Sequence, residues 1–299
     1  MVYYTVQNGL FKHFNKKYWR FIMQRDPRFW VWGYVLDKVP GKAEFVPVPT
    51  SCSLETGADY LKCGSVFWMN PLHGQEAICD QQLERLQAFP RVVAGLTHIE
   101  TNGPGLGGWR VEYYESAMRL ARISLKYRNL QGVIIDDFRS PTGPSRYMTD
   151  EELKQIYCDM KAINPALKLY VVYYHTTQHP DSLLSCKDYF DGMTVWCWRS
   201  TDYFWNALYE EEIRILRENY AGKELIQGQF IHAYGDGDIP QPMDQLTNQC
   251  SRIAAQLDRG KLDGWCALQT GWFSFQDHRE QVEYVRNFWN WFRDTRTIL

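Results

Sequence analysis

Two adjacent carboxylic acids, Asp136 and Asp137, directly follow a short apolar stretch with the sequence Gly-Val-Ile-Ile, residues 132–135. Two carboxylates side by side in a partly dry pocket repel each other, so we expect the pKa of one to rise and that of the other to stay low. A neutral acid beside an anion is what general acid catalysis with charge stabilisation requires. The pair therefore predicts acid–base chemistry, with Asp136 and Asp137 as candidate catalytic residues.

A structural role for the pair is the alternative interpretation. In that case Asp136 hydrogen-bonds a neighbouring loop, and Asp137 pairs with Arg139 or Arg199. Successive residues of a strand face opposite ways, so one aspartate could be structural while the other is catalytic.

Short runs of β-branched and aromatic residues recur at intervals of roughly 25 to 40 residues, with amphipathic stretches between them. The runs predict the strands Trp30–Leu36, Ser65–Met69, Val92–Ile99, Gly132–Asp137, Lys168–Tyr174, Met193–Trp198, Glu224–Ile231 and Gly264–Gln269. Helical periodicity is evident in Glu112–Tyr127, Glu151–Ile163, Asp202–Asn219, Met243–Asp258 and His278–Arg293. Thr149 and Glu152 have the spacing of a capping box, which predicts that a helix begins there.

Alternating strands and helices, eight of each, predict an α/β fold of the (β/α)8 TIM-barrel type. No linker-like Pro, Gly or Ser tract divides the chain, so we expect a single catalytic domain over residues 29–299. Residues 1–28 are expected to form an N-terminal helical extension. Three predicted strands open at a glycine, Gly132, Gly192 or Gly264, where we expect a tight turn into the barrel floor.

In TIM barrels the functional site lies at the C-terminal ends of the strands. Aromatic and polar side chains gather there, and these are the candidate substrate-binding residues: Tyr34, Asp37, Trp68, Tyr173, Tyr174, His175, Trp196, Trp198, Arg199, Gln229, His232, Tyr234, Gln269 and Trp272. The chain is 15% aromatic, although Leu, Ile and Val usually fill barrel interiors. Many of the rings could simply fill the top of the barrel, but rings with polar tips also suit the apolar faces and hydroxyl rims of sugars.

The strand sequence Gly-Val-Ile-Ile-Asp-Asp-Phe, residues 132–138, resembles the fourth strand of TIM-barrel glycoside hydrolases that carry an acidic pair at its end. It is similar to the Asp-Asp of O-linked N-acetylglucosaminidases and to the strand end of endo-α-1,4-polygalactosaminidase-like proteins. The resemblance covers these residues and the overall barrel plan. The hexosaminidase pattern implies that Asp136 orients the substrate's acetamide, an internal nucleophile, and that Asp137 is the general acid.

A conventional mechanism with two carboxylates across the sugar is the alternative within this class. Glu100, at the end of the third predicted strand, is the preferred partner and a third candidate catalytic residue, followed by Asp37, Asp236 and Asp238. A carboxylate separation of roughly 5 to 5.5 Å would indicate retention of the anomeric configuration, and roughly 6.5 to 9.5 Å inversion.

No metal or cofactor is expected. His175 and His179 could ligate a metal beside Asp137, but the segment is loop-like, with Pro180 following, and we favour His175 as a hydrogen-bonding partner of the substrate. The eight cysteines include no C-x-x-C spacing, which argues against a zinc site. Residues 103–108 match G-x-G-x-x-G but lack the acidic residue that would bind a ribose, so we interpret them as a loop over the barrel mouth.

The charges nearly cancel, because 33 Lys and Arg residues face 35 Asp and Glu residues. This balance argues against nucleic acid and anionic membrane surfaces as partners. The chain also contains neither a signal-type stretch nor an apolar run long enough to span a membrane. We therefore expect a cytoplasmic protein, or an exported one whose signal peptide lies outside this sequence. Nothing in the sequence indicates the oligomeric state.

These observations together predict a glycoside hydrolase that cleaves an oligo- or polysaccharide, with the strand-4 aspartates as acid and as nucleophile or stabiliser. Two other classes remain open. A non-catalytic carbohydrate-binding barrel would bind sugars without releasing a product. A metal-dependent sugar isomerase or lyase would lose activity on chelation.

Overall fold

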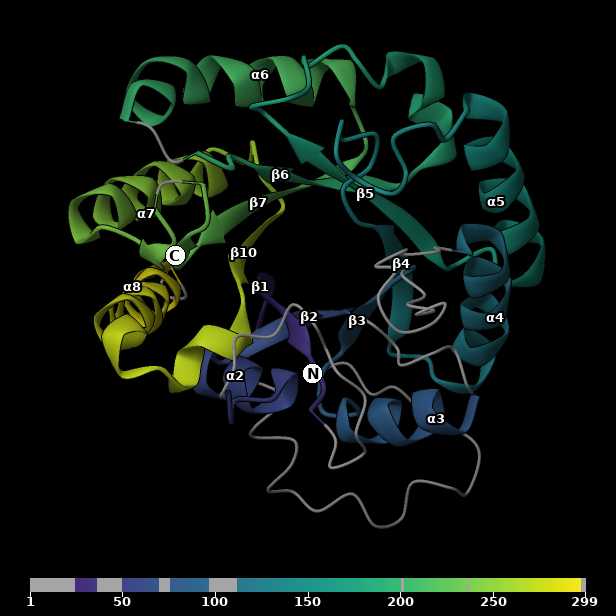
Figure 1. Cartoon of the computed structure of the whole chain (residues 1–299), viewed down its shortest axis with the longest axis horizontal. Coiled ribbons are helices and arrows are strands. Elements are labelled where there is room, and N and C mark those ends of the chain that lie inside the picture. Colours follow the sequence, from purple (N-terminus) through teal and green to yellow (C-terminus); the bar gives the residue numbers. More distant parts are fainter. Residues whose placement is uncertain are drawn as a thin grey trace, which may run out of the picture.

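Eight parallel strands form a closed barrel at the centre of the molecule (Figure 1). The computed structural model describes residues 25–36, 50–69, 76–96, 112–199, 202–235 and 237–296. The barrel strands are β1 (Asp26–Tyr34), β2 (Cys63–Met69), β3 (Arg91–Gly95), β4 (Leu130–Ile135), β5 (Lys168–Tyr174), β6 (Gly192–Trp196), β7 (Glu224–Phe230) and β10 (Gly264–Leu268). They are neighbours in chain order, and β10 pairs with β1 to close the barrel. The predicted TIM barrel is confirmed.

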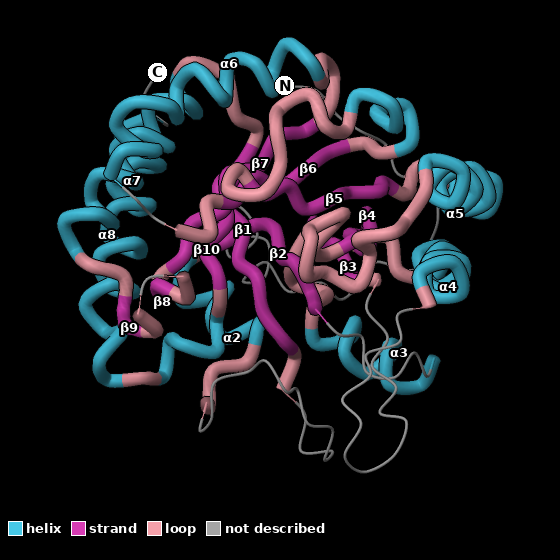
Figure 2. Tube along the Cα trace, turned by 45° about the horizontal axis from the view of Figure 1, so that its top comes forward, coloured by secondary structure: helices cyan, strands magenta, loops and turns pink. Residues whose placement is uncertain are grey.

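Helices surround the strands (Figure 2). They are α2 (Leu54–Leu61), α3 (Glu76–Arg85), α4 (Tyr113–Lys126), α5 (Asp150–Ile163), α6 (Tyr209–Asn219), α7 (Met243–Asp258) and α8 (Arg279–Arg296). The connection after β5 differs from the expected pattern, because it holds the 3-10 helix η2 (Leu184–Tyr189) instead of an α-helix. The π-helix η3 (Phe204–Leu208) precedes α6, and η4 (Thr270–Ser274) and η5 (Gln276–His278) precede α8.

Short segments adjoin two of the barrel strands, β7 and β1. A small antiparallel pair, β8 (His232–Ala233) and β9 (Ile239–Pro240), follows β7. Of the N-terminal extension expected over residues 1–28, residues 1–24 lie outside the described residues, and residues 26–28 belong to β1 instead of a helix.

Aromatic rings fill the inside of the barrel. Trp30 stacks on Phe67 with ring centroids 4.6 Å apart, and Trp32 meets Trp196 edge to face at 5.8 Å. All four rings are at most 4% exposed. Some of the aromatic residues are therefore core residues, and they occupy the barrel interior that Leu, Ile and Val usually fill.

Glycines make room for these rings. A Cβ at Gly132 or Gly192 would lie 2.8 Å or 2.7 Å from the ring of Tyr170, and one at Gly264 would lie 2.7 Å from the Trp30 indole nitrogen. Neither a turn nor a left-handed backbone explains these three positions. The expected tight turns are thus replaced by close approaches between a strand and a ring.

Charged residues close the floor of the barrel. Arg91 and Lys168 approach the Glu224 carboxylate at 2.7 Å and 2.9 Å, and the Tyr170 hydroxyl donates to it. Burial opposes ionisation of Glu224, but the attraction of Arg91, with the hydrogen bonds, lowers its pKa. These residues stand at or near the N-terminal ends of their strands. The opposite end of the barrel is therefore the one available for a site.

The predicted capping box is present at the start of α5. The Glu152 backbone N–H donates to Thr149 Oγ1 at 3.1 Å, and the Thr149 N–H donates to Glu152 Oε2 at 2.7 Å. We expect Thr149→Ala to lower the free energy of unfolding by about 1 kcal/mol, measured by urea denaturation. Thr142→Ala, an exposed threonine in the preceding loop, is the control. Equal stability of the two variants would contradict the prediction.

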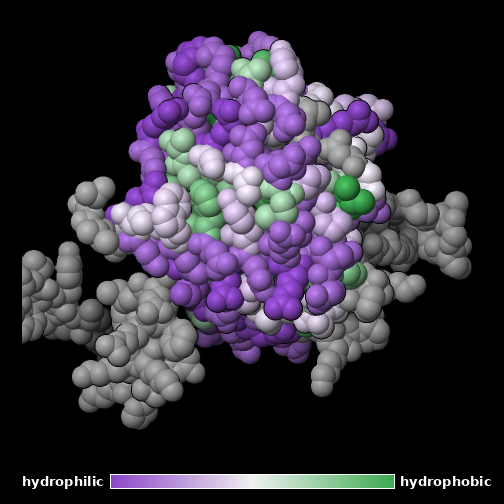
Figure 3. Space-filling model, turned by 90° about the vertical axis from the view of Figure 1, so that its left-hand side faces the viewer, coloured by the Kyte–Doolittle hydropathy of each residue, from purple (hydrophilic) through white to green (hydrophobic). Residues whose placement is uncertain are grey.

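Within the described residues, no helix is long and apolar enough to cross a membrane. The molecular face that carries α7 and α8 is largely hydrophilic, with limited hydrophobic areas among the polar side chains (Figure 3). This agrees with helices that direct their apolar sides toward the barrel.

Candidate active site

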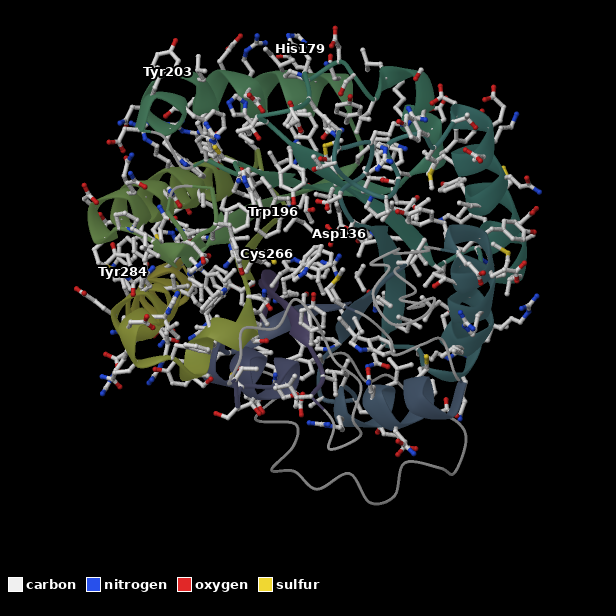
Figure 4. The ribbon with its side chains drawn as sticks, in the orientation of Figure 1. Asp136, His179, Trp196, Tyr203, Cys266 and Tyr284 are labelled. Atoms are coloured by element: carbon white, nitrogen blue, oxygen red, sulfur yellow. The ribbon has the colours of Figure 1, made fainter. Side chains whose placement is uncertain are left out.

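The aspartate pair lies at the C-terminal end of β4. Ile134 belongs to the apolar cluster inside the barrel and Ile135 to the layer beneath the helices. Since strand residues two apart face the same side, Asp136 follows Ile134 toward the barrel interior. Figure 4 shows Asp136 near the barrel axis. Asp137 has left-handed backbone (φ 47°), and its N–H donates to Asp136 Oδ1 at 2.9 Å.

The loop after the pair is held by short-range hydrogen bonds. The Asp137 carbonyl oxygen accepts from Ser145 Oγ at 2.9 Å and from the Ser140 N–H at 3.0 Å. Ser145 Oγ in turn accepts from the Arg139 N–H at 3.0 Å. A Cβ at Gly143 would lie 2.6 Å from the Asp137 carbonyl oxygen, so only glycine permits this approach.

Two arginines are the expected structural partners of Asp137, but one of them binds other groups and the other is exposed to solvent. Arg139 donates to the Met148 carbonyl oxygen and to the Asp150 carboxylate, at 2.9 Å and 2.6 Å. Arg199 is exposed. Across the part of the chain that the structure describes, no ion pair reaches either aspartate of the pair. The structural interpretation through Arg139 is therefore wrong.

Both aspartates have raised pKa values, whereas the sequence led us to expect one high and one low. Burial is the larger cause for Asp136, whose pKa rises well above its ordinary value, and the charge of Asp137 adds to it. Burial also raises the pKa of Asp137, and a hydrogen bond from Tyr174 opposes this. Repulsion alone would raise one pKa and leave the other low, but desolvation of both carboxyl groups raises both pKa values.

These raised pKa values predict how stability depends on pH. A carboxyl group with a raised pKa in the folded state contributes stability below its unfolded pKa, near 3.8, and that stability is lost as the pH rises through the folded-state pKa. We therefore expect Asp136→Asn to gain stability over the natural protein as the pH rises from about 4 toward neutrality, by about 1.4 kcal/mol per unit of pKa difference.

Urea unfolding at a series of pH values measures this effect. Asp150→Asn is the matched control, because a hydrogen bond from Arg139 lowers the pKa of Asp150. Its stabilising contribution is present above the unfolded pKa and is lost as the pH falls. If the free energy of unfolding of Asp136→Asn differed from that of the natural protein by the same amount at all pH values, the pKa of Asp136 would not be raised.

Four of the predicted rings gather at the mouth of the barrel around the pair. The charges of Asp136 and Asp137 help burial to raise the pKa of Tyr34 and of Tyr174, which places both tyrosines close to the pair. Trp198 and Tyr234 are stacked, with centroids 5.6 Å apart and planes at 19°. Trp198 is 42% exposed, so its ring is available to a ligand.

Tyr234 is held in place by two further predicted residues. Its hydroxyl accepts from Trp272 Nε1 at 2.6 Å and from Gln269 Nε2 at 3.1 Å. The backbone of Gly235 passes close to Trp198. The mouth on the side of β6, β7 and β10 is thus a connected set of rings and amides.

A pair of buried histidines supports these rings. His232 stacks on Trp272 at 3.9 Å, and its Nδ1 lies 2.9 Å from His278 Nε2. The outer nitrogens, His232 Nε2 and His278 Nδ1, lie 2.7 Å from the carboxylates of Asp238 and Asp277. Carboxylates only accept hydrogen bonds, so the two outer nitrogens are the donors in these contacts.

Burial lowers the pKa of His278, which favours the neutral form of its ring. Asp238, one of the acids proposed to face the pair, is instead the partner of His232 and is 84% exposed at its side chain.

The structure places other predicted residues away from the mouth. Trp68, Tyr173 and Gln229 lie in the layer between the barrel and the helices, where they bond Gln82, Glu212 and Trp265 respectively. Trp196 fills the barrel interior and is 1% exposed. These four positions are part of the core.

His175 takes a supporting position. Its Nδ1 bonds the Glu212 carboxylate, and its ring stacks on Phe204 at 3.7 Å. His179 pairs with Asp181 at 2.6 Å and is 80% exposed, at the periphery in Figure 4. Within the described ranges there is no group of three or more potential metal ligands.

Sequence reasoning missed Tyr113, Ser145, Glu212 and His278. Tyr113 opens α4, and burial raises its pKa, with the charges of Asp136 and Asp137 adding to this. Its place at the first turn of a helix that follows a barrel strand could have drawn attention to it. Asp37, Glu100 and Asp236 lie outside the described residues.

Comparisons with known proteins establish the fold. The chain is similar to the catalytic core of xylanase A (TM-score 0.53, 10% identity, covering 88% of this chain and 99% of that one). It is also similar to the GH18 chitinase ChiB of Flavobacterium johnsoniae (TM-score 0.50, 9% identity, covering 89% and 94%). No family model and no curated protein sequence matches. The two families suggested by the strand-4 resemblance are not confirmed.

Proposed function

We propose that the chain is a glycoside hydrolase acting on an oligo- or polysaccharide. The observation that carries the proposal is the pair Asp136 and Asp137, half-buried together at the C-terminal end of β4 with raised pKa values. An acid that stays protonated near neutral pH can protonate a glycosidic oxygen. The neighbouring anion stabilises the positive charge that develops on the sugar.

The electrostatics favour Asp136 as the protonated member of the pair. Its pKa is raised by burial and by the charge of Asp137, while the hydrogen bond from Tyr174 favours the anion at Asp137. This assignment reverses the roles that the hexosaminidase resemblance implies. The proton of Asp136 then passes to the leaving oxygen as the C–O bond breaks, and a water molecule loses a proton and forms the new bond to the anomeric carbon. Glu100 remains the proposed partner across the sugar.

The rings supply the sugar contacts in this proposal. Trp198, stacked on Tyr234 and 42% exposed, offers a flat face to a pyranose ring. Tyr34 and Tyr174 bring hydroxyl groups close to the aspartates. Flat apolar surface beside hydrogen-bonding groups is the combination that sugars require, because their faces are apolar and their rims carry hydroxyls.

A screen against aryl glycosides and polysaccharides tests the proposal, with the anomer of the first product followed by NMR. Release of a reducing sugar is the expected result, and the anomer distinguishes retention from inversion. Oligosaccharide binding without product would instead identify a non-catalytic carbohydrate-binding barrel. Activity that disappears on chelation would favour a metal-dependent sugar isomerase or lyase.

A further inference from the structure

A groove lies between the N-terminal ends of α4 and α5, beside the loop that follows β4. Its volume is about 580 Å³, and Tyr113, Tyr114 and Tyr147 stand on its walls. Small-molecule sites typically occupy about 300 to 1,000 Å³. The groove is therefore large enough for at least one sugar unit.

The groove adjoins the aspartate pair. Ser145 lines it and donates from Oγ to the Asp137 carbonyl oxygen at 2.9 Å. Tyr113, also in the lining, lies close enough to Asp136 and Asp137 for their charges to act on its hydroxyl. Helix N-termini face the end of a TIM barrel where the strands finish. A ligand in the groove and a ligand at the pair would lie on the same face.

Two tyrosine rings of the groove are exposed to solvent, and the Arg146 guanidinium lies over one of them, 4.8 Å from the centroid of the Tyr147 ring. Tyr147 is 81% exposed and Tyr114 is 38% exposed. The Tyr114 hydroxyl donates to Asp159 at 2.8 Å, which fixes the orientation of that ring. Exposed aromatic rings beside polar groups are typical of binding surfaces.

The charges that line the groove select the class of ligand. Its lining includes the carboxylates of Glu115 and Glu152. The lining residues that the structure describes include neither lysine nor arginine, and Arg146 lies beside them, over the Tyr147 ring. Like charges repel at short range, so acidic sugars and phosphorylated ligands are disfavoured. Carboxylates accept hydrogen bonds from the hydroxyl groups of uncharged sugars.

We propose that this groove is a remote subsite for an uncharged sugar unit of a chain whose other end reaches Asp136 and Asp137. The inference rests on the proposed function, because it assigns the same substrate to both places. It specifies that the substrate is a neutral oligo- or polysaccharide, several units long, and that Tyr147 stacks on a unit removed from the bond that breaks.

Binding measurements test the subsite without requiring turnover. Calorimetry with short and long xylo-, cello- and N-acetylchito-oligosaccharides compares the natural protein with Tyr147→Ala. We expect the variant to bind the long members about tenfold more weakly and the short members unchanged, a difference of about 1.4 kcal/mol. Tyr147→Phe and Tyr147→Trp retain a ring and are expected to restore the affinity.

Trp291→Ala is the matched control, because Trp291 is 51% exposed on α8, outside the groove. Equal affinity of Tyr147→Ala and Trp291→Ala for long oligosaccharides would overturn the subsite, and so would preferential binding of acidic oligosaccharides or binding to none. If the screen detects hydrolysis but Tyr147→Ala binds long oligosaccharides with unchanged affinity, the proposed function stands and the groove is not a sugar subsite. If long oligosaccharides bind more tightly than short ones but none is hydrolysed, the groove is a sugar site and the proposed hydrolase is contradicted.

Discussion

Asp136→Asn and Asp137→Asn are each expected to lower the turnover of an unactivated oligosaccharide by about a hundredfold to ten-thousandfold, which is the usual contribution of a positioned acid or base. Asparagine keeps the shape of the side chain but cannot donate the acidic proton or carry the negative charge. Circular dichroism and thermal unfolding check that both variants stay folded. Near-natural rates in both would contradict the proposed function.

Substrates with different leaving groups separate the roles of the two aspartates. A dinitrophenolate leaves without protonation, so the variant that lacks the general acid should recover much of its rate on a dinitrophenyl glycoside. We expect this recovery for Asp136→Asn, because Asp136 has the more strongly raised pKa. Asp137→Asn should stay slow on both kinds of substrate, since it lacks the stabilising charge.

The control for these rates is Asp181→Asn. Asp181 is 62% exposed at its side chain and pairs with the exposed His179, so its substitution should leave both rates unchanged. Recovery on the activated substrate by Asp137→Asn rather than Asp136→Asn would restore the roles implied by the hexosaminidase resemblance. The proposed hydrolase would stand, with the two aspartates exchanged.

Trp196→Ala is expected to lower the free energy of unfolding by about 3 to 5 kcal/mol, the usual cost of removing a large ring from a core. The ring is 1% exposed and packs against Trp32 and Phe230 inside the barrel. Its indole N–H donates to Thr194 Oγ1 at 2.8 Å. Its loss leaves a cavity that the closed barrel cannot collapse to fill, and urea denaturation measures the effect.

Two further variants bracket this prediction. A Cβ at Gly228 would overlap the Trp196 ring, so Gly228→Ala should also destabilise, by about 1 to 3 kcal/mol through overpacking. Trp198→Ala removes a ring of the same type that is 42% exposed. It should cost much less stability and act on sugar binding instead. If Trp196→Ala and Trp198→Ala were equally stable, Trp196 would not be a core residue.

The elements of the fold could be predicted from the sequence because each has a local cause. The capping box at Thr149 and the apolar spacing of the helix after it predicted α5 with nearly its observed bounds. The strand Lys168–Tyr174 was predicted at its observed bounds. One element of another type is η2, because the chain between β5 and β6 forms a 3-10 helix where the alternating pattern predicts an α-helix.

The direction in which each strand residue faces could not be predicted. A parallel barrel strand is buried on both sides, so apolar residues do not alternate with polar ones. Tyr173 and Tyr174 are of the same type and adjacent, yet Tyr173 packs outside the barrel and Tyr174 lies beside Asp137. The same ambiguity led to Trp68 and Gln229 being predicted as substrate-binding residues.

Strand periodicity and the position of Asp136 and Asp137 are local properties, and they are enough to predict a TIM barrel with two adjacent carboxylates and several rings at one end. The packing of distant segments desolvates both carboxyl groups, turns Arg139 to Asp150, and makes Trp196 a core residue while Trp198 stays accessible. Desolvation and facing depend on neighbours that are distant along the chain. They are set when the barrel closes.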